Sequence, residues 1–177
     1  MFKGIVIILA LMVCYLISLY NGLIHKMNAV EQSRSGIEVA LTKRYDMLSK
    51  MRDVAKNYIN HEKDVLAQVI SMRGGMSLKE MQSADSSMNT VHKELIALAE
   101  SYPELRSDSV FKELQISIRD VEDHLQAARR AYNASVTAYN NAIEMFPSSI
   151  IANARGCQKI QLFEGREESM KDVEMTF

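Results

Sequence analysis

The sequence has few residues that interrupt helices. Its 177 residues include only two prolines, Pro103 and Pro147, seven glycines and no tryptophan. Strand-rich folds need a turn signal about every 8–12 residues, and this chain cannot supply that many. The expected fold class is therefore all-α, with long helices and few connections.

A surplus of one charge and a cysteine framework are also missing. The 21 basic and 22 acidic residues give a net charge of −1. No nucleic acid is expected as a partner, because phosphate binding needs a basic surplus or patch. Cys14 and Cys157 belong to no CxxC motif or Cys/His cluster. Since Cys14 lies inside an apolar run, a disulfide between them is not expected.

Motifs for catalysis, metals and cofactors are absent as well. The sequence contains no GxG and no G-K-[ST] phosphate-binding motif. His61-Glu62 does not start an HExxH motif, because Val65 occupies the place of the second histidine. The Glu-x-x-His pairs of di-iron bundles are missing too. We therefore expect a protein that is not an enzyme and has no cofactor or metal site.

The N-terminus carries an uncharged apolar run. Gly4 to Tyr20 reads GIVIILALMVCYLISLY and covers roughly 25 Å at about 1.5 Å per residue, near the lower limit for crossing a bilayer. The prediction is a transmembrane anchor over residues 1–22. The alternative, a cleaved signal peptide, is disfavoured because Lys3 is its sole basic residue and no small-x-small cleavage site follows.

The basic residues near the apolar run predict an orientation. Lys3 precedes the run, whereas Lys26, Arg34, Lys43 and Arg44 follow it. The positive-inside rule therefore favours a single-pass protein of the cell (inner) membrane with its N-terminus outside and its bundle in the cytoplasm.

Three stretches repeat apolar residues at spacings of three and four, as in coiled coils: Leu23–Met72, Met81–Tyr102 and Phe111–Phe146. Linkers of about 5–6 residues make neighbouring helices antiparallel. The expected architecture is an N-terminal transmembrane helix that continues into an up-and-down bundle over residues 23–163, followed by a flexible tail over 164–177. The first stretch is either one helix or folds back near Tyr45–Ser49, so the bundle has three or four long helices.

The helix ends carry local signals. Ser77-x-x-Glu80 predicts a capping box at the start of the second helix, and Pro103 predicts its end. Ser107-Asp108 predicts the cap of the third helix.

Charged residues interrupt the first apolar stripe at Arg34, Arg44 and Glu62. If they are buried they must pair, because an unpaired buried charge is costly. Arg44 with Glu62 is the expected pair if the first stretch folds back, and Arg129 is another candidate. The alternative is that these side chains snorkel at an edge of the bundle.

Tyr132-Asn133 and Tyr139-Asn140 lie one heptad apart, and Phe146 follows after another heptad. These residues are expected to share one helix face. The face is interpreted either as core aromatics with amides that fix the helix register or as a binding groove.

Several strings resemble the LemA family in the family's order and spacing from about residue 20 to residue 164. The segment 37–48 reads IEVALTKRYDML and resembles a family signature. Departures are Arg34, Ser49 and Cys157, where the family usually has tryptophan, proline and an aromatic. The other matching residues include Tyr20, Asn21, Tyr58, His61, Glu62, Tyr102, Pro103, Arg129, Tyr132, Asn133, Tyr139, Asn140, Phe146, Pro147 and Gly156.

The resemblance implies a bacterial single-pass membrane protein with a helical bundle and no agreed biochemical function. Members are linked to other membrane proteins. We therefore expect a membrane-tethered scaffold or adaptor whose partners are the membrane, other membrane proteins or further copies of itself. The alternative is a ligand-sensing bundle with a cavity lined by Tyr132, Tyr139 and Asn140.

Overall fold

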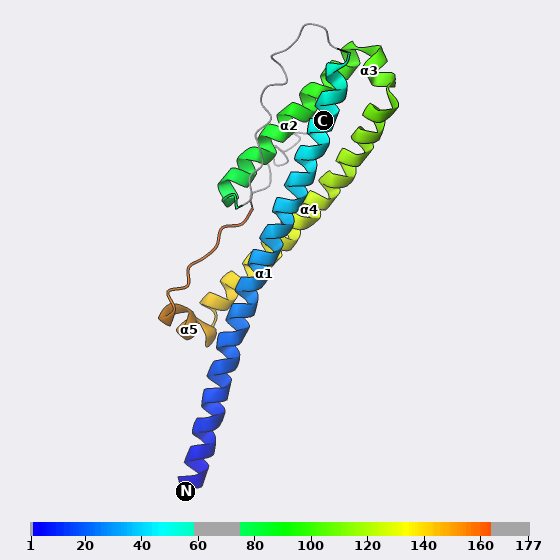
Figure 1. Ribbon diagram of the computed structural model, residues 1–177. Helices are drawn as coiled ribbons and strands as arrows, with labels where there is room; N and C mark the ends of the chain where they lie inside the picture. Colours follow the sequence, from blue (N-terminus) through cyan, green and yellow to red (C-terminus); the bar gives the residue numbers. More distant parts are fainter. Residues whose placement is uncertain (1, 59–74, 164–177) are drawn as a thin grey trace, which may run out of the picture.

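The computed structural model describes residues 2–58 and 75–163. Within these ranges the secondary structure consists of helices without strands, which confirms the predicted all-α fold class. The helices are α1 (Phe2–Lys56), α2 (Leu78–Ser101), α3 (Pro103–Ser107), α4 (Ser109–Glu144) and α5 (Ser148–Ala154). Three of them are long, and α3 and α5 are short helices at the two ends of α4 (Figure 1).

Helix α1 is one uninterrupted helix of 55 residues, about 82 Å long at about 1.5 Å per residue. It passes through Tyr45–Ser49 without a break, so the first stretch does not fold back there. The side chains of residues 2–18 are exposed. From Leu23 onward one face of α1 is buried, with residues at heptad-like spacings: Leu23, Val30, Ile37, Leu41, Arg44, Leu48, Met51 and Ala55. Part of the stripe, residues 59–72, lies outside the described residues.

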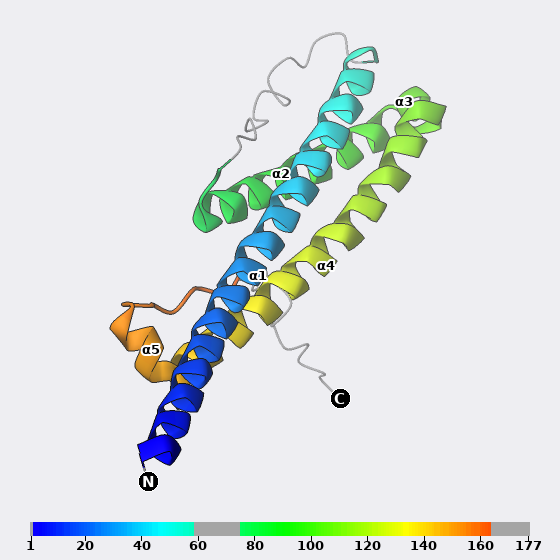
Figure 2. The same ribbon diagram turned by 60° about the horizontal axis from the view of Figure 1, so that its bottom comes forward.

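Helices α1 and α2 run in the same direction, and α4 runs antiparallel to both (Figures 1 and 2). Hydrogen-bonded residue pairs show the same parallel direction of α1 and α2. Arg34 bonds the carbonyl of Met76, and Tyr58 bonds Asp108, so both sequence positions increase together along α1 and α2–α3. Antiparallel neighbours were expected throughout, and this expectation is wrong for α1 and α2. The chain between them, which includes residues 59–74 outside the described ranges, is longer than the predicted short linker.

The starts of α2 and α4 follow the predicted local signals. The Ser77 hydroxyl accepts from the Glu80 amide at 3.3 Å, and the Glu80 carboxylate accepts from the Ser77 amide at 2.6 Å, which confirms the capping box. At α4 the Asp108 carboxylate accepts from the Phe111 amide at 2.8 Å. Helix α2 ends at Ser101, two residues before Pro103.

The end of α4 differs from the heptad prediction. The helix ends at Glu144, and Met145 has an extended backbone. Phe146, expected on the buried stripe, is 81% exposed. Phe146 directly precedes Pro147, and the residue before a proline is disfavoured in the helical conformation. The helix, and with it the heptad repeat, therefore ends before Phe146. Helix α5 follows, and the chain turns back at Gly156, whose φ of +66° suits glycine.

Candidate functional site

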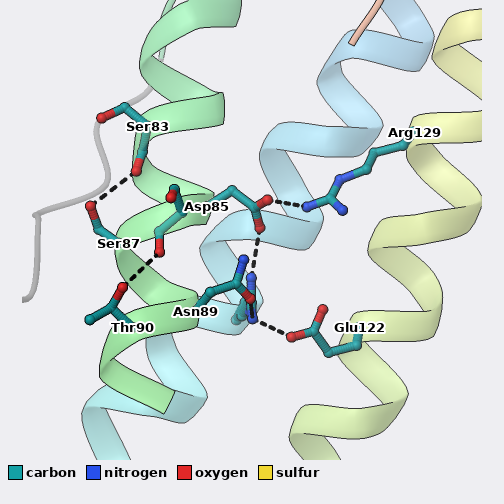
Figure 3. A network of polar contacts seen from close by, with 9 residues as sticks. Ser83, Asp85, Ser87, Asn89, Thr90, Glu122 and Arg129 are labelled. Atoms are coloured by element: carbon teal, nitrogen blue, oxygen red, sulfur yellow. Dashed lines mark hydrogen bonds and ion pairs between the residues drawn. The ribbon is translucent and has the colours of Figure 1, made fainter. Parts of the chain in front are cut away.

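A polar network joins the three long helices, and Arg44 is at its centre. The Arg44 side chain is completely buried. One of its terminal nitrogens donates to Asp85 at 2.6 Å, and the other donates to Asn89 at 2.6 Å and to the Glu122 carboxylate. Arg129 donates to the second oxygen of Asp85. Figure 3 shows these groups of α2 and α4 pointing into the space between the helices, where α1 passes.

The network shows how the bundle accommodates Arg44, a charged residue on the apolar stripe of α1. Two arginines face two carboxylates, so the buried charges are matched and hydrogen-bonded, as burial requires. The expectation that Arg44 snorkels at an edge is wrong. Asp85 and Glu122 were not identified from the sequence because each directly follows a stripe residue and so lies beside the apolar pattern. The predicted partner Glu62 lies outside the described residues.

The other charged stripe residue, Arg34, lies closer to the surface. It donates to the carbonyl of Met76 at 2.6 Å, and its side chain keeps 32% of its exposure. The cap of α2 is thereby tied to α1.

Burial shifts the pKa values of two groups in and beside the network, Glu122 and His92. Desolvation is the largest cause that raises the pKa of Glu122 above its ordinary value, and Asp85 raises it further. Arg44 and Arg129 act in the opposite direction. The pKa of the nearby His92 is lowered, first by burial and then by the charge of Arg44. Each charged group is bonded to another member, so the arrangement works as a cross-link between helices.

A second set of polar contacts, here called the amide ladder, holds the segment 157–163 against α4. The Asn140 side chain donates to the Ile160 carbonyl at 2.9 Å and accepts from the Ile160 amide at 3.0 Å. Asn133 does the same with Phe163, at 3.0 and 2.8 Å. Each asparagine therefore pairs with both backbone polar groups of one residue.

The heptad spacing of the two asparagines explains this register. Seven helical residues rise about 10.5 Å, and three extended residues rise about 10 Å. The spacing from Asn133 to Asn140 thus matches the spacing from Ile160 to Phe163, so both amides can bond the same extended segment.

Aromatic side chains complete this face. Tyr132 and Tyr139 are buried, and the Tyr132 hydroxyl donates to the Gln161 carbonyl at 3.1 Å. Phe163 is buried, and the Arg129 guanidinium lies 5.2 Å from its ring centroid, within cation–π range. The structure thus brings together the two predicted tyrosine–asparagine pairs but not Phe146. The tyrosines of this face belong to the buried core, as the core interpretation expects, and the chain's own segment 157–163 covers the face.

Further predicted residues lie at the two ends of the bundle. The Tyr58 hydroxyl donates to Asp108 at 2.7 Å and joins the end of α1 to the cap of α4. This bond is the largest cause that lowers the pKa of Asp108. At the other end the Arg155 guanidinium lies 4.9 Å from the ring centroid of Tyr20. Asn21 is exposed. His61, like Glu62, lies outside the described residues, and Pro147 directly precedes α5.

An open groove of about 560 Å³ lies between α1 and α4, directly after the apolar run. Most of its residues are small, so a neighbouring helix could approach its walls closely. A Cβ atom added at Gly22 would meet nothing within 4 Å. The groove is lined by Gly22, His25, Lys26 and Ala29 of α1 and by Ala134, Ser135 and Ala138 of α4.

The chain is similar in sequence to known proteins. The chain is 24% identical to Protein LemA of Metamycoplasma hominis over 159 residues, covering 87% of this chain and 73% of that protein. It is 22% identical to the magnetosome protein MamQ of Magnetospirillum gryphiswaldense over 174 residues, covering 81% of this chain and 64% of MamQ. A MamQ protein of Paramagnetospirillum magneticum is 28% identical over 86 residues, which cover 49% of this chain and 32% of that relative. The model of the LemA family matches residues 33–177, well over half of the sequence, and the chain therefore belongs to the LemA family.

Proposed function

We propose that this protein is a membrane-anchored helical scaffold, in which the apolar part of α1 spans the bilayer and the bundle binds other membrane proteins. The continuity of α1 carries this proposal. Among the described residues α1 is the one helix that is long and apolar enough to cross a membrane, and the same helix forms a wall of the bundle. Membership of the LemA family and similarity to a magnetosome protein support a membrane-associated role.

The groove between α1 and α4, directly after the apolar run, is the proposed contact surface. Small residues let two helix backbones approach closely, which is how helices associate in membranes. The expected occupant is a helix of a partner membrane protein, and a second copy of this chain is the other outcome of the test. The proposed role is binding.

Site-specific crosslinking in native membranes tests this proposal. A photoreactive residue replaces Ala134, which faces the groove, and a matched control replaces Ile116, which is 59% exposed elsewhere on α4. We expect discrete crosslinked species from position 134 and none above background from position 116. Mass spectrometry then identifies them as further copies of the chain or as one partner membrane protein. Equal crosslinking at both positions would contradict the proposal.

A substitution provides the second arm of the test. Gly22→Leu places a bulky side chain at the groove, and its Cβ meets no neighbour within 4 Å. Gly36→Leu is the control, because a Cβ at Gly36 on the same helix is equally free of neighbours. Crosslinking from position 134 should fall strongly in Gly22→Leu and remain in Gly36→Leu.

The orientation is part of the proposal. We infer an outside N-terminus and a cytoplasmic bundle from the basic residues that follow the apolar run. In a chain without native cysteines, Ser109→Cys on α4 should react with a membrane-impermeant maleimide only after the cells are lysed. Labelling of Ser109→Cys in intact cells would show that the bundle lies outside the cytoplasm and that the proposed orientation is wrong.

Ligand sensing is the alternative function. A ligand at Tyr132, Tyr139 and Asn140 would have to displace the segment 157–163 from the amide ladder. A metabolite that raises the thermal midpoint of the wild type, but not of Asn140→Ala, would favour this alternative over the scaffold.

A further inference from the structure

Large apolar side chains are exposed at the connection between α4 and α5. Phe146 is 81% exposed, Met145 is 63% exposed and Ile150 is 60% exposed. Most other exposed apolar side chains of the bundle stand singly along its helices, as at Val39 and Ile116, which is normal for a protein surface. The three side chains of Met145, Phe146 and Ile150 lie within six residues and form an exposed apolar cluster, here called the α4–α5 corner. The exposure of such a cluster to solvent needs an explanation.

The register of α1 against α4 shows which residues of α1 lie at the level of this corner. Arg44 contacts Glu122, and Tyr58 contacts Asp108, so each step along α1 is matched by an equal step back along α4. Continuing this register for 22 residues places Glu144, the end of α4, level with Gly22. The corner that follows is therefore level with the end of the apolar run.

Two observations agree with this position. The Arg155 guanidinium, directly after α5, lies over the ring of Tyr20 at 4.9 Å. In Figures 1 and 2, α5 lies at the end of the bundle from which the N-terminal part of α1 projects, on the side away from α3.

We propose that the α4–α5 corner inserts into the interfacial layer of the bilayer that α1 spans, and so forms a second contact between the bundle and the lipid. This inference rests on the proposed membrane anchor. Aromatic and aliphatic side chains at the level of the headgroups bury their apolar surface there, as in interfacial segments of other proteins. Arg155, held over Tyr20, carries a positive charge to the same level, where lipid phosphates lie.

The consequence is a fixed orientation of the bundle on the membrane. A single helix leaves the attached domain free to rotate about the helix axis, whereas a second point of insertion on one side of that axis removes this freedom. The same face of the bundle, including the groove beside α1, is then always presented at a constant height above the bilayer.

Depth-dependent fluorescence quenching of the full-length protein tests the inference. Single-cysteine chains carry an environment-sensitive fluorophore at Cys14, at Phe146→Cys, at Ile150→Cys or at Ile116→Cys, with the remaining native cysteines replaced by alanine. Each chain is reconstituted into two sets of phosphatidylcholine vesicles, one with a nitroxide on the acyl chain near the headgroup and one with the nitroxide deep in the acyl chain. We expect several-fold stronger quenching at positions 146 and 150 than at position 116. Ile116 is 59% exposed, like Ile150 at 60%, but lies 28 residues before the end of α4 at Glu144.

The label at Cys14 separates the two proposals, because this residue lies within the apolar run of α1. If Cys14 is not quenched by nitroxides placed deep in the acyl chains, the membrane anchor itself is wrong. If Cys14 is quenched but positions 146 and 150 behave like position 116, the anchor holds and the insertion of the corner is overturned.

A charge substitution checks that insertion depends on the apolar side chain. Phe146→Asp should lower the quenching of a label at position 150, because a carboxylate is costly to bury in the interface. Ile116→Asp is the matched control and should leave it unchanged. Unchanged quenching in Phe146→Asp would also overturn the inference. The exposure of both sites leaves the fold of the bundle intact, which circular dichroism would verify.

Discussion

Replacing Arg44 with methionine tests whether the polar network stabilises the bundle. Methionine keeps a long unbranched side chain at a site that is completely buried, so the loss of the guanidinium is the main change. Asp85 keeps its bond from Arg129, but Glu122 and Asn89 lose the donor that the structure gives them.

The magnitude follows from the burial of the partners. Removing one member of a buried ion pair costs about 3–5 kcal/mol, because the other charge stays buried without compensation. The Glu122 side chain is 28% exposed and can regain some hydration, so we expect the lower end, about 3 kcal/mol. This corresponds to a roughly 100-fold change in the equilibrium constant for unfolding.

Urea unfolding of the full-length protein in a mild detergent, followed by circular dichroism, measures this loss. Lys43→Met is the matched control, because Lys43 is the exposed neighbour of Arg44 on α1, and it should change stability by less than about 0.5 kcal/mol. Adding Glu122→Gln to Arg44→Met should recover about 1 kcal/mol by removing the orphaned charge. A stability of Arg44→Met within about 0.5 kcal/mol of the wild type would refute the reasoning.

Three further predictions concern other parts of the bundle. In Asn140→Ala, hydrogen exchange in the segment 157–163 should accelerate, because two bonds to its backbone are lost at a cost of about 1–3 kcal/mol. The exposed Asn141→Ala is the control, and equal exchange in both variants would contradict the amide ladder. The raised pKa of Glu122 means that the folded state holds the proton of this carboxyl to higher pH than the unfolded chain does. The stability that this proton binding contributes is complete below pH 4.5 and is lost as the pH rises through the pKa of the folded state. The free energy of unfolding of the wild type, measured relative to Glu122→Gln, should therefore fall as the pH is raised from 4.5 towards neutrality, and a flat difference would count against the predicted shift. Gly36→Ala should stabilise the protein by about 0.5–1 kcal/mol in the same urea assay, because the helix is continuous there and the added Cβ meets no neighbour.

The helices and their ends could be predicted because their signals are local. The capping box at Ser77 and the cap at Asp108 involve residues only three apart, and the helices begin there in the structure. The stripe of α1 is also informative, since burial follows its spacing from Ile37 to Ala55. Nearer the apolar run the agreement is weaker, because Met27 on the same spacing is 46% exposed. Phe146 shows the limit of such a pattern, because the heptad repeat was extended past the point where the following proline ends the helix.

The partners of Arg44 could not be predicted, because they depend on how the helices are arranged in space. The sequence marks Arg44 as a charged interruption of the apolar stripe, but the predicted antiparallel order of neighbouring helices is wrong for α1 and α2. The parallel arrangement brings Asp85 to Arg44, whereas the fold-back, one of the two predicted alternatives, pairs Arg44 with Glu62. The role of Asn133 and Asn140 was missed for a related reason, since their partner is the backbone of a non-helical segment, which carries no side-chain pattern.

The length of α1 has a mechanical consequence for a protein anchored as proposed. The helix continues from Tyr20 to Lys56 without a hinge, a lever of about 54 Å at about 1.5 Å per residue. A change of about 10° in the tilt of the membrane-spanning part, well within the range that transmembrane helices show, would move the far end of the lever by about 9 Å. The bundle would thus convert small differences in bilayer thickness into large displacements of the end of α1 at Lys56.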